Sequence, residues 1–151
     1  MMIARFVFTA VFCWTASLYA SEPQGNKAPV LANEALIIIR AVSQDTSGPL
    51  LVYLYNEKET WLKVDRSYRK IVLENKAKSE YRWSLKNLPA GEYAVQVIHD
   101  EDANGTLTMG MFGPSEGVGV SQYVPTFIPR FNKAKFKHNG QVTKALVEMN
   151  Y

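Results

Sequence analysis

The sequence predicts an all-β fold, an antiparallel two-sheet sandwich of about seven strands with an immunoglobulin-like or transthyretin-like layout. Three observations favour this fold. Short apolar or alternating segments recur along the chain, turn residues separate them at regular spacing, and no segment after the N-terminal region has a convincing helical pattern. A closed barrel would have a similar number of strands, so it remains an alternative.

Residues 1–20 have the layout of a cleavable signal peptide, expected as a helix. One basic residue, Arg5, precedes an apolar run over 6–16, and the small residue Ala20 stands where cleavage is expected before Ser21. The run is shorter than the about 20 apolar residues that a bilayer-spanning helix needs. We therefore expect an exported protein, periplasmic or secreted, with no transmembrane segment in the mature chain.

A single domain is expected over residues 35–151, after a flexible leader at 21–34 that contains two prolines and a glycine. Cleavage removes Arg5 from the 17 basic residues, so 16 basic residues stand against 14 acidic ones. This balance is too near neutrality to predict a nucleic-acid partner. The only cysteine, Cys13, lies in the signal region, so a hydrophobic core and not a disulfide must hold the mature domain together.

The first part of the domain predicts four strands. The segment ALIIIRAV is apolar and β-branched, and LLVYLY is apolar on both faces, which is typical of a central strand. The charged segment 75–80 is expected to be a hairpin loop between the last two of the four. Trp61 stands in a polar setting, where we expect it to cover one open end of the core and keep its N–H for water. The four expected strands are 35–42, 50–55, 71–74 and 81–85.

The second part of the domain begins with the clearest β signal. After the turn at Pro89–Gly91, residues 93–100 alternate between two faces of a strand. Tyr93 stands where a tyrosine corner would bond back to the preceding backbone. Residues 123–128 contain a proline, and they predict at most an edge strand or an irregular crossing.

Two further strands are expected to close the domain as a hairpin. Three lysines alternate with other residues over 133–138, which is typical of a solvated strand face or of an edge guarded against aggregation. The segment VTKALVEM at 142–149 predicts the last strand. Asn139-Gly140 lies between the two segments and is the strongest two-residue hairpin signal in the chain.

The loop after the strand at 93–100 has the spacing of a calcium-binding loop. Two aspartates and an asparagine recur at every second residue and Gly105 follows, as in the D-x-[DN]-x-[DN]-G motif. Hard Ca²⁺ prefers oxygen ligands on flexible side chains, and the glycine permits the sharp bend. Thr106 could add its backbone carbonyl, and Glu116 could return from the Gly-rich loop at 113–121. The candidate ligands of Ca²⁺ are therefore Asp100, Asp102, Asn104, Thr106 and Glu116.

The match covers only the first half of an EF-hand loop. The ninth and twelfth positions of that loop hold Thr108 and Met111, so we do not expect a helix-flanked hand. Asp and Asn side chains also form Asx turns, so a solvated turn is the alternative explanation of the same residues.

Three segments resemble an exported bacterial family, domain of unknown function 2141. They are LPAGEYAVQVIHDEDANGTL at 88–107, GPSEGVGVS at 113–121 and PRFNKAKF at 129–136. The family pattern is similar to L-P-x-G-x-Y-A-x-x-x-x-H-D-x-N-x-N-G-x-L-D, and the resemblance extends over residues 36–151. It implies a secreted or periplasmic β-sandwich and brings no established activity. The sequence departs from the pattern at Asp102, where Asn is usual, and at Thr108, where Asp is usual.

The sequence favours a non-catalytic protein. His99 and His138 are the only histidines, and no nucleophile motif accompanies them. We therefore expect an exported binding or envelope-associated module, whose partner would be a protein, a glycan or a small ligand. The alternative is a small metal-assisted hydrolase that uses His99, Asp100 and Glu116. An isolated strand histidine is more commonly a hydrogen-bonded structural residue than a base.

Overall fold

The computed structural model describes residues 33–151. The expected signal peptide at 1–20, and all but the last two residues of the expected leader at 21–34, lie outside the described residues. The described chain is nearly all β, as predicted. Seven strands follow one continuous sheet in the order β3-β2-β5-β8-β10-β1-β4. Their bounds are β1 (Glu34–Arg40), β2 (Leu50–Tyr55), β3 (Arg69–Leu73), β4 (Tyr81–Lys86), β5 (Gly91–His99), β8 (Gly117–Ser121) and β10 (Thr143–Asn150).

The remaining elements are short and attach to this sheet. Strand β9 pairs with the start of β5, and β6 pairs with β7 in a separate two-stranded ribbon. Their bounds are β6 (Met109–Gly110), β7 (Gly113–Pro114), β9 (Phe136–His138), the 3₁₀ helices η1 (Lys58–Thr60) and η2 (Val64–Arg66), and the α-helix α1 (Phe131–Ala134). No helix in the described part of the chain is long and apolar enough to cross a membrane.

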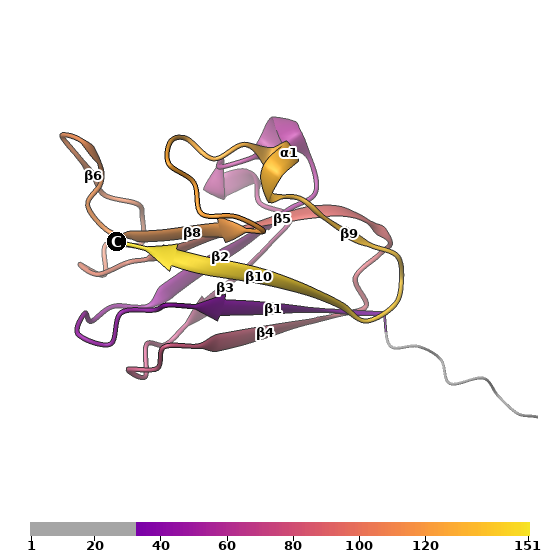
Figure 1. The fold of residues 1–151 in the computed structure, drawn as a ribbon, viewed down its shortest axis with the longest axis horizontal. Coiled ribbons are helices and arrows are strands. Elements are labelled where there is room, and N and C mark those ends of the chain that lie inside the picture. The colour runs from indigo at the N-terminus through magenta and orange to yellow at the C-terminus, as the bar shows by residue number, and fades with distance from the viewer. Residues whose placement is uncertain (1–32) are drawn as a thin grey trace, which may run out of the picture.

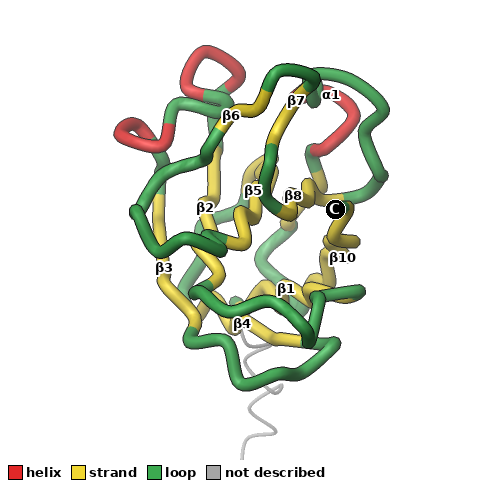
Figure 2. Tube along the Cα trace, turned by 90° about the vertical axis from the view of Figure 1, so that its left-hand side faces the viewer, coloured by secondary structure: helices red, strands yellow, loops and turns green. Residues whose placement is uncertain are grey.

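The sheet curls around its own core. Seen end-on in Figure 2, the strands follow one another around the molecule from β3 to β4, the two edge strands. Strands β1 and β10 pair in parallel, whereas every other strand pair is antiparallel within residues 33–151. The prediction of a wholly antiparallel arrangement was therefore wrong for β1 and β10. This pair joins the first strand of the domain to its last (Figure 1).

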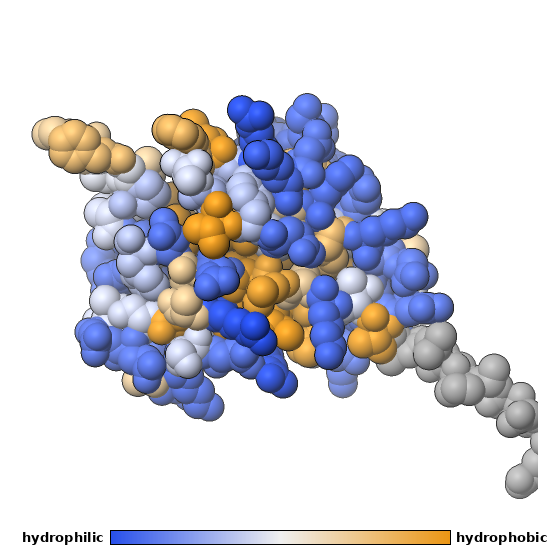
Figure 3. All heavy atoms as spheres, in the orientation of Figure 1, coloured by the Kyte–Doolittle hydropathy of each residue, from blue (hydrophilic) through white to orange (hydrophobic). Residues whose placement is uncertain are grey.

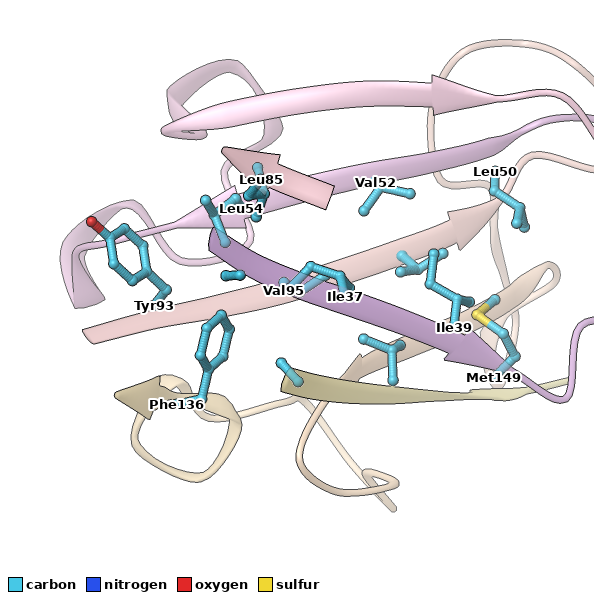
Figure 4. Close-up of a cluster of buried hydrophobic side chains, with 14 of the residues drawn as sticks. Ile37, Ile39, Leu50, Val52, Leu54, Leu85, Tyr93, Val95, Phe136 and Met149 are labelled. Carbon is cyan, nitrogen blue, oxygen red and sulfur yellow. The ribbon is translucent and has the colours of Figure 1, made fainter. Parts of the chain in front are cut away.

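Alternate side chains of each strand fill the interior. In β1, Ala35, Ile37 and Ile39 are fully buried while the residues between them are half-buried, as the period of a strand requires. The same alternation in β10 buries Ala145 and Val147. These residues meet the inner faces of β2 and β5 in one apolar cluster (Figure 4). Burial of this cluster provides the main driving force for folding.

Strands β2 and β5 are buried on both faces, as the apolar run at 50–55 predicts. Their outer faces meet a second apolar cluster, to which α1 contributes Phe131 and Ala134. Trp61 packs edge-on against Tyr55, with ring centroids 5.1 Å apart, and donates its indole N–H to the Pro129 carbonyl at 2.9 Å. The expectation that this N–H faces water was wrong, because the segment before α1 folds over it.

The predicted strand at 133–138 was wrong in its first half. The chain forms a single helical turn, α1, and only then the strand β9. Residues Phe131 and Ala134 are both buried, and three-residue spacing brings two side chains to the same side of a helix but to opposite sides of a strand. Burial of this pair therefore requires the helical turn.

Both expected hairpins were wrong. Strands β3 and β4 are opposite edges of the sheet, and the segment 75–80 connects them without a ladder. The Tyr81 hydroxyl holds this connection by donating to Asn75 Oδ1 at 2.9 Å and accepting from the Lys76 N–H at 2.6 Å. Gly140 does adopt a turn conformation, with φ +82°, but β9 pairs with β5 and β10 pairs with β1 and β8.

The Gly-rich segment at 117–121, expected as a loop, is the central strand β8. It pairs with both β5 and β10. A Cβ on Gly119 would lie 2.8 Å from the Glu148 carbonyl oxygen of β10 and would meet neighbouring side chains at similar distances. Glycine in this strand therefore marks a close approach to β10 and not a flexible loop.

The predicted tyrosine corner is confirmed. The Tyr93 hydroxyl donates to the Pro89 carbonyl at 2.9 Å, and the ring packs between Tyr68 and Phe136 at centroid distances of 5.9 and 6.2 Å. The corner fixes the entry to β5, the strand that pairs with the largest number of neighbours.

Replacement of Tyr93 by Phe removes this hydrogen bond and keeps the ring. We expect the free energy of unfolding, measured by urea denaturation, to fall by about 1 kcal/mol, the usual worth of one such bond. Tyr68→Phe is the matched control, because the Tyr68 hydroxyl makes no hydrogen bond within residues 33–151. Equal losses in the two variants would contradict a stabilising corner.

Stability should also fall at alkaline pH. Burial raises the pKa of the Tyr53, Tyr55 and Tyr93 hydroxyls above the ordinary value. Below about pH 10 these groups are protonated in both states, whereas above it the unfolded chain releases protons that the folded chain retains. These tyrosines should therefore leave the free energy of unfolding independent of pH below about pH 10 and lower it above that pH. The fall should be shallower in Tyr55→Phe. Urea denaturation series at several pH values measure this slope, and equal slopes in wild type and variant would contradict the assignment.

Candidate metal centre

The register of β5 and β8 brings two acidic residues together. His99 of β5 pairs with Gly117 of β8 in antiparallel register, so Asp100, just after β5, and Glu116, just before β8, come next to each other. Between them the chain forms the loop at 101–108 and the β6–β7 ribbon. The candidate residues therefore lie where β5 ends and the neighbouring strand β8 begins (Figure 1).

Three of the five predicted ligands lie in one group. Carboxylate oxygens of Asp100, Asp102 and Glu116 lie within 4.8 Å of one another. Calcium–oxygen bonds are about 2.3 to 2.6 Å long, so two ligands of one ion can be up to about 5.2 Å apart. The spacing of the three carboxylates therefore fits a shared cation. Asp100 and Glu116 are buried, and Asp102 is exposed.

Asp100 organises the turn that follows it. Its Oδ1 accepts the Asn104 N–H at 3.0 Å and its Oδ2 accepts the Gly105 N–H at 2.8 Å. Gly105 has φ +81°, a conformation that glycine adopts without steric cost. The loop between β1 and β2 packs on the same backbone, and a Cβ on Gly48 would lie 1.9 Å from the Asp100 carbonyl oxygen. Backbone contacts therefore hold this carboxylate in place.

Glu116 and Glu101 tie the two strand ends together reciprocally. Glu116 Oε1 accepts the Glu101 N–H at 3.2 Å, and Glu101 Oε1 accepts the Gly117 N–H at 3.1 Å. Glu116 Oε2 accepts the Thr108 N–H at 2.8 Å. Neither Glu101 nor Thr108 was predicted as a site residue. Their roles depend on backbone N–H groups that a motif of side chains does not describe.

The other two predicted ligands are engaged with each other. The Asn104 amide oxygen accepts both the N–H and the hydroxyl of Thr106, at 2.8 and 2.9 Å, which uses both of its acceptor positions. The Asn104 amide nitrogen donates to Asp102 and to Thr108. Ligation by the Asn104 oxygen would require release of at least one of these bonds to Thr106. Thr106 was predicted to ligate through its backbone carbonyl, which these bonds do not test, so both residues remain predicted ligands.

The negative charge of this group has no basic partner nearby. Within residues 33–151, no lysine, arginine or histidine nitrogen lies within 4.0 Å of the carboxylates of Asp100, Asp102 or Glu116. Burial raises the pKa of Tyr53, and the charge of Asp100 raises it further. Several like charges close together in a partly buried place repel one another, which favours occupation by a cation.

His99 faces away from the carboxylates into a separate polar network. It is fully buried, with Nδ1 2.9 Å from the Tyr151 hydroxyl and Nε2 3.1 Å from Asn75 Nδ2. The Asn75 amide nitrogen only donates, which assigns Nε2 as the acceptor of that bond. The Tyr151 ring covers Gly117, where a Cβ would lie 2.2 Å from it. His99 is thus a hydrogen-bonded strand residue and does not join the group of possible metal ligands.

Comparisons with known proteins agree with the resemblance described above. No curated protein and no solved structure matches the chain. One family model, described as an uncharacterized protein conserved in bacteria (DUF2141), matches residues 39–145. The match begins inside β1, ends inside β10, and includes the strands and loops that form the candidate metal centre. The chain therefore belongs to the DUF2141 family of bacterial proteins.

Proposed function

We propose that this protein is an exported, non-catalytic binding or envelope-associated module in which the loop Asp100–Gly105, together with Glu116, binds Ca²⁺. The observation that carries the proposal is the group of three carboxylates within 4.8 Å of one another, with no basic nitrogen of residues 33–151 within 4.0 Å of them. A divalent cation at this place would compensate their charge.

The donor set favours calcium over softer metals. All three side chains offer oxygen, whereas zinc sites use mainly histidine and cysteine. Each carboxylate oxygen of Asp100 and Glu116 accepts one backbone N–H and has a further lone pair available. Backbone carbonyls of the loop and water can complete a coordination shell that calcium tolerates in irregular form.

A bound cation would act on the loops and not on a substrate bond. It would link the end of β5, the turn at 101–105 and the start of β8, and so restrict the root of the β6–β7 ribbon. The hydrolase alternative needs His99 beside Asp100 and Glu116. His99 instead contacts Asn75 and Tyr151, so no contact supports that alternative.

We further propose that the curled sheet is a variant of the immunoglobulin-like or transthyretin-like sandwich. Two features support this assignment: β1 and β10 face β2 and β5 across one core, and Tyr93 forms a tyrosine corner. Export is supported by the signal-like composition of residues 1–20, and the family is bacterial.

Calcium should stabilise the protein against unfolding. A ligand at a hundred times its dissociation constant adds about 2.7 kcal/mol to the free energy of unfolding. We therefore expect the melting temperature in Ca²⁺ to exceed that in EDTA. Asp102→Asn keeps an oxygen acceptor for the Asn104 N–H but removes one charged ligand, and it should weaken calcium affinity, measured by calorimetry, by roughly tenfold or more.

Asp65→Asn is the matched control, because Asp65 is exposed on η2 and lies outside the carboxylate group. It should bind Ca²⁺ as the wild type does. The proposal fails if the wild type melts at the same temperature in Ca²⁺ and in EDTA and shows no heat of binding.

A further inference from the structure

The most exposed large apolar side chains of the described chain lie in two loops. Met111 and Phe112, at the tip of the β6–β7 ribbon, are 90% and 99% exposed. Phe127 and Ile128, in the loop at 122–130 between β8 and α1, are 89% and 82% exposed. Single exposed apolar residues are common on protein surfaces, but adjacent pairs at loop tips indicate an interaction site.

The two loops rise from the same side of the molecule. Strand β8 separates them in sequence, and Gln122, with φ +74°, reverses the chain after β8. A bridge between Val120 and Tyr123 then sends the second loop back along β8 toward the ribbon. Both loops lie at the upper edge of Figure 1 and of Figure 2, and Figure 3 shows apolar atoms projecting there in two groups.

Basic side chains accompany the second loop. Arg130 and Lys133 line a surface hollow with Phe127 and Ile128, and they share a neighbouring hollow with Lys58. None of these three basic side chains forms an ion pair with a described residue. Lys133 Nζ lies 6.0 Å from the centre of the Tyr123 ring, which holds it beside the loop. The loop therefore presents apolar tips with positive charge behind them.

We propose that these two loops dock the protein on a bilayer that contains anionic phospholipid. The four apolar side chains enter the region between headgroups and acyl chains, while Arg130, Lys133 and Lys58 contact lipid phosphates. A fluid bilayer accepts the apolar side chains in any conformation, and its negative charge complements the three basic residues.

The carboxylate group at the root of the ribbon affects this docking. Asp102 is exposed, and its charge opposes an anionic surface until a cation neutralises it. Only this calcium dependence rests on the function proposed above. The apolar and basic contacts do not need Ca²⁺, so we expect docking in EDTA and stronger docking in Ca²⁺.

Tryptophan placed at the loop tips tests the docking directly. Phe112→Trp and Phe127→Trp are made in the full chain, and Val72→Trp, on the edge strand β3, is the matched control at an exposed apolar position. Each is mixed in EDTA with vesicles of equal parts phosphatidylglycerol and phosphatidylcholine, and the wild-type emission is subtracted. We expect the added emission to shift to shorter wavelength and to be quenched by brominated acyl chains at positions 112 and 127, but not at 72.

The charge requirement has its own pair of variants. In the Phe127→Trp background, replacement of Arg130 and Lys133 by Gln should weaken vesicle binding on the order of tenfold or more. Each basic residue near an anionic bilayer contributes to the free energy of binding, and this variant removes two of them. Replacement of Lys137 and Lys144 by Gln removes the same charge from β9 and β10 and should leave vesicle binding nearly unchanged.

Three outcomes would overturn the proposal. Emission at positions 112 and 127 that vesicles leave unchanged, with or without Ca²⁺, would exclude insertion. Equal binding to pure phosphatidylcholine vesicles would exclude the contact with anionic lipid. Emission already shifted without vesicles, and reversed by dilution, would show that a second copy of the chain covers the loops. Docking in EDTA that Ca²⁺ does not strengthen would support the bilayer contact and count against the calcium site alone.

Discussion

The structure depends on β5, which is hydrogen-bonded on both edges and buried on both faces. It pairs with β2 over residues 94–99, with β8 over residues 96–99 and with β9 over residues 91–93. Its side chains contribute to both apolar clusters, so the inner core and the layer that contains α1 are built on opposite faces of the same strand. Tyr93 fixes its entry, and at its exit the chain turns at once into the carboxylate loop. The candidate metal centre therefore stands on the most constrained backbone of the molecule.

Local pattern predicted much of the fold. The alternation at 93–100, the apolar run at 50–55 and the tyrosine corner correspond to β5, β2 and the bond from Tyr93 to Pro89. These features depend on period and on turn chemistry within a few residues. The pairing partners were not predictable in the same way, because the parallel contact of β1 with β10 and the separation of β3 from β4 depend on side chains that are distant in sequence.

The candidate site was predicted only in part, because side-chain spacing can be read from the sequence and strand register cannot. Oxygen side chains at alternate positions identified Asp100 and Asp102, and Glu116 was added because it could return from the Gly-rich segment that follows. Thr108 and Glu101 were missed because they act through backbone N–H groups whose partners are set by strand register. The Gly-rich segment at 117–121 was expected as a loop because its pairing partners are also set by strand register. Its glycines make room for β10 and for Tyr151, which composition alone does not reveal.

The parallel pair of β1 and β10 has a consequence for how the domain is completed. The first strand lies between β4 and the last strand, so one of its edges has no partner until nearly the whole chain is present. In a chain that emerges gradually from a ribosome or a translocation pore, this edge of β1 would stay without its hydrogen-bonding partner for most of that time. Pairings this distant in sequence form slowly, and unpaired strand edges attract other chains. Protection of the nascent polypeptide by a chaperone therefore matters more for this topology than for a sheet built from successive neighbours.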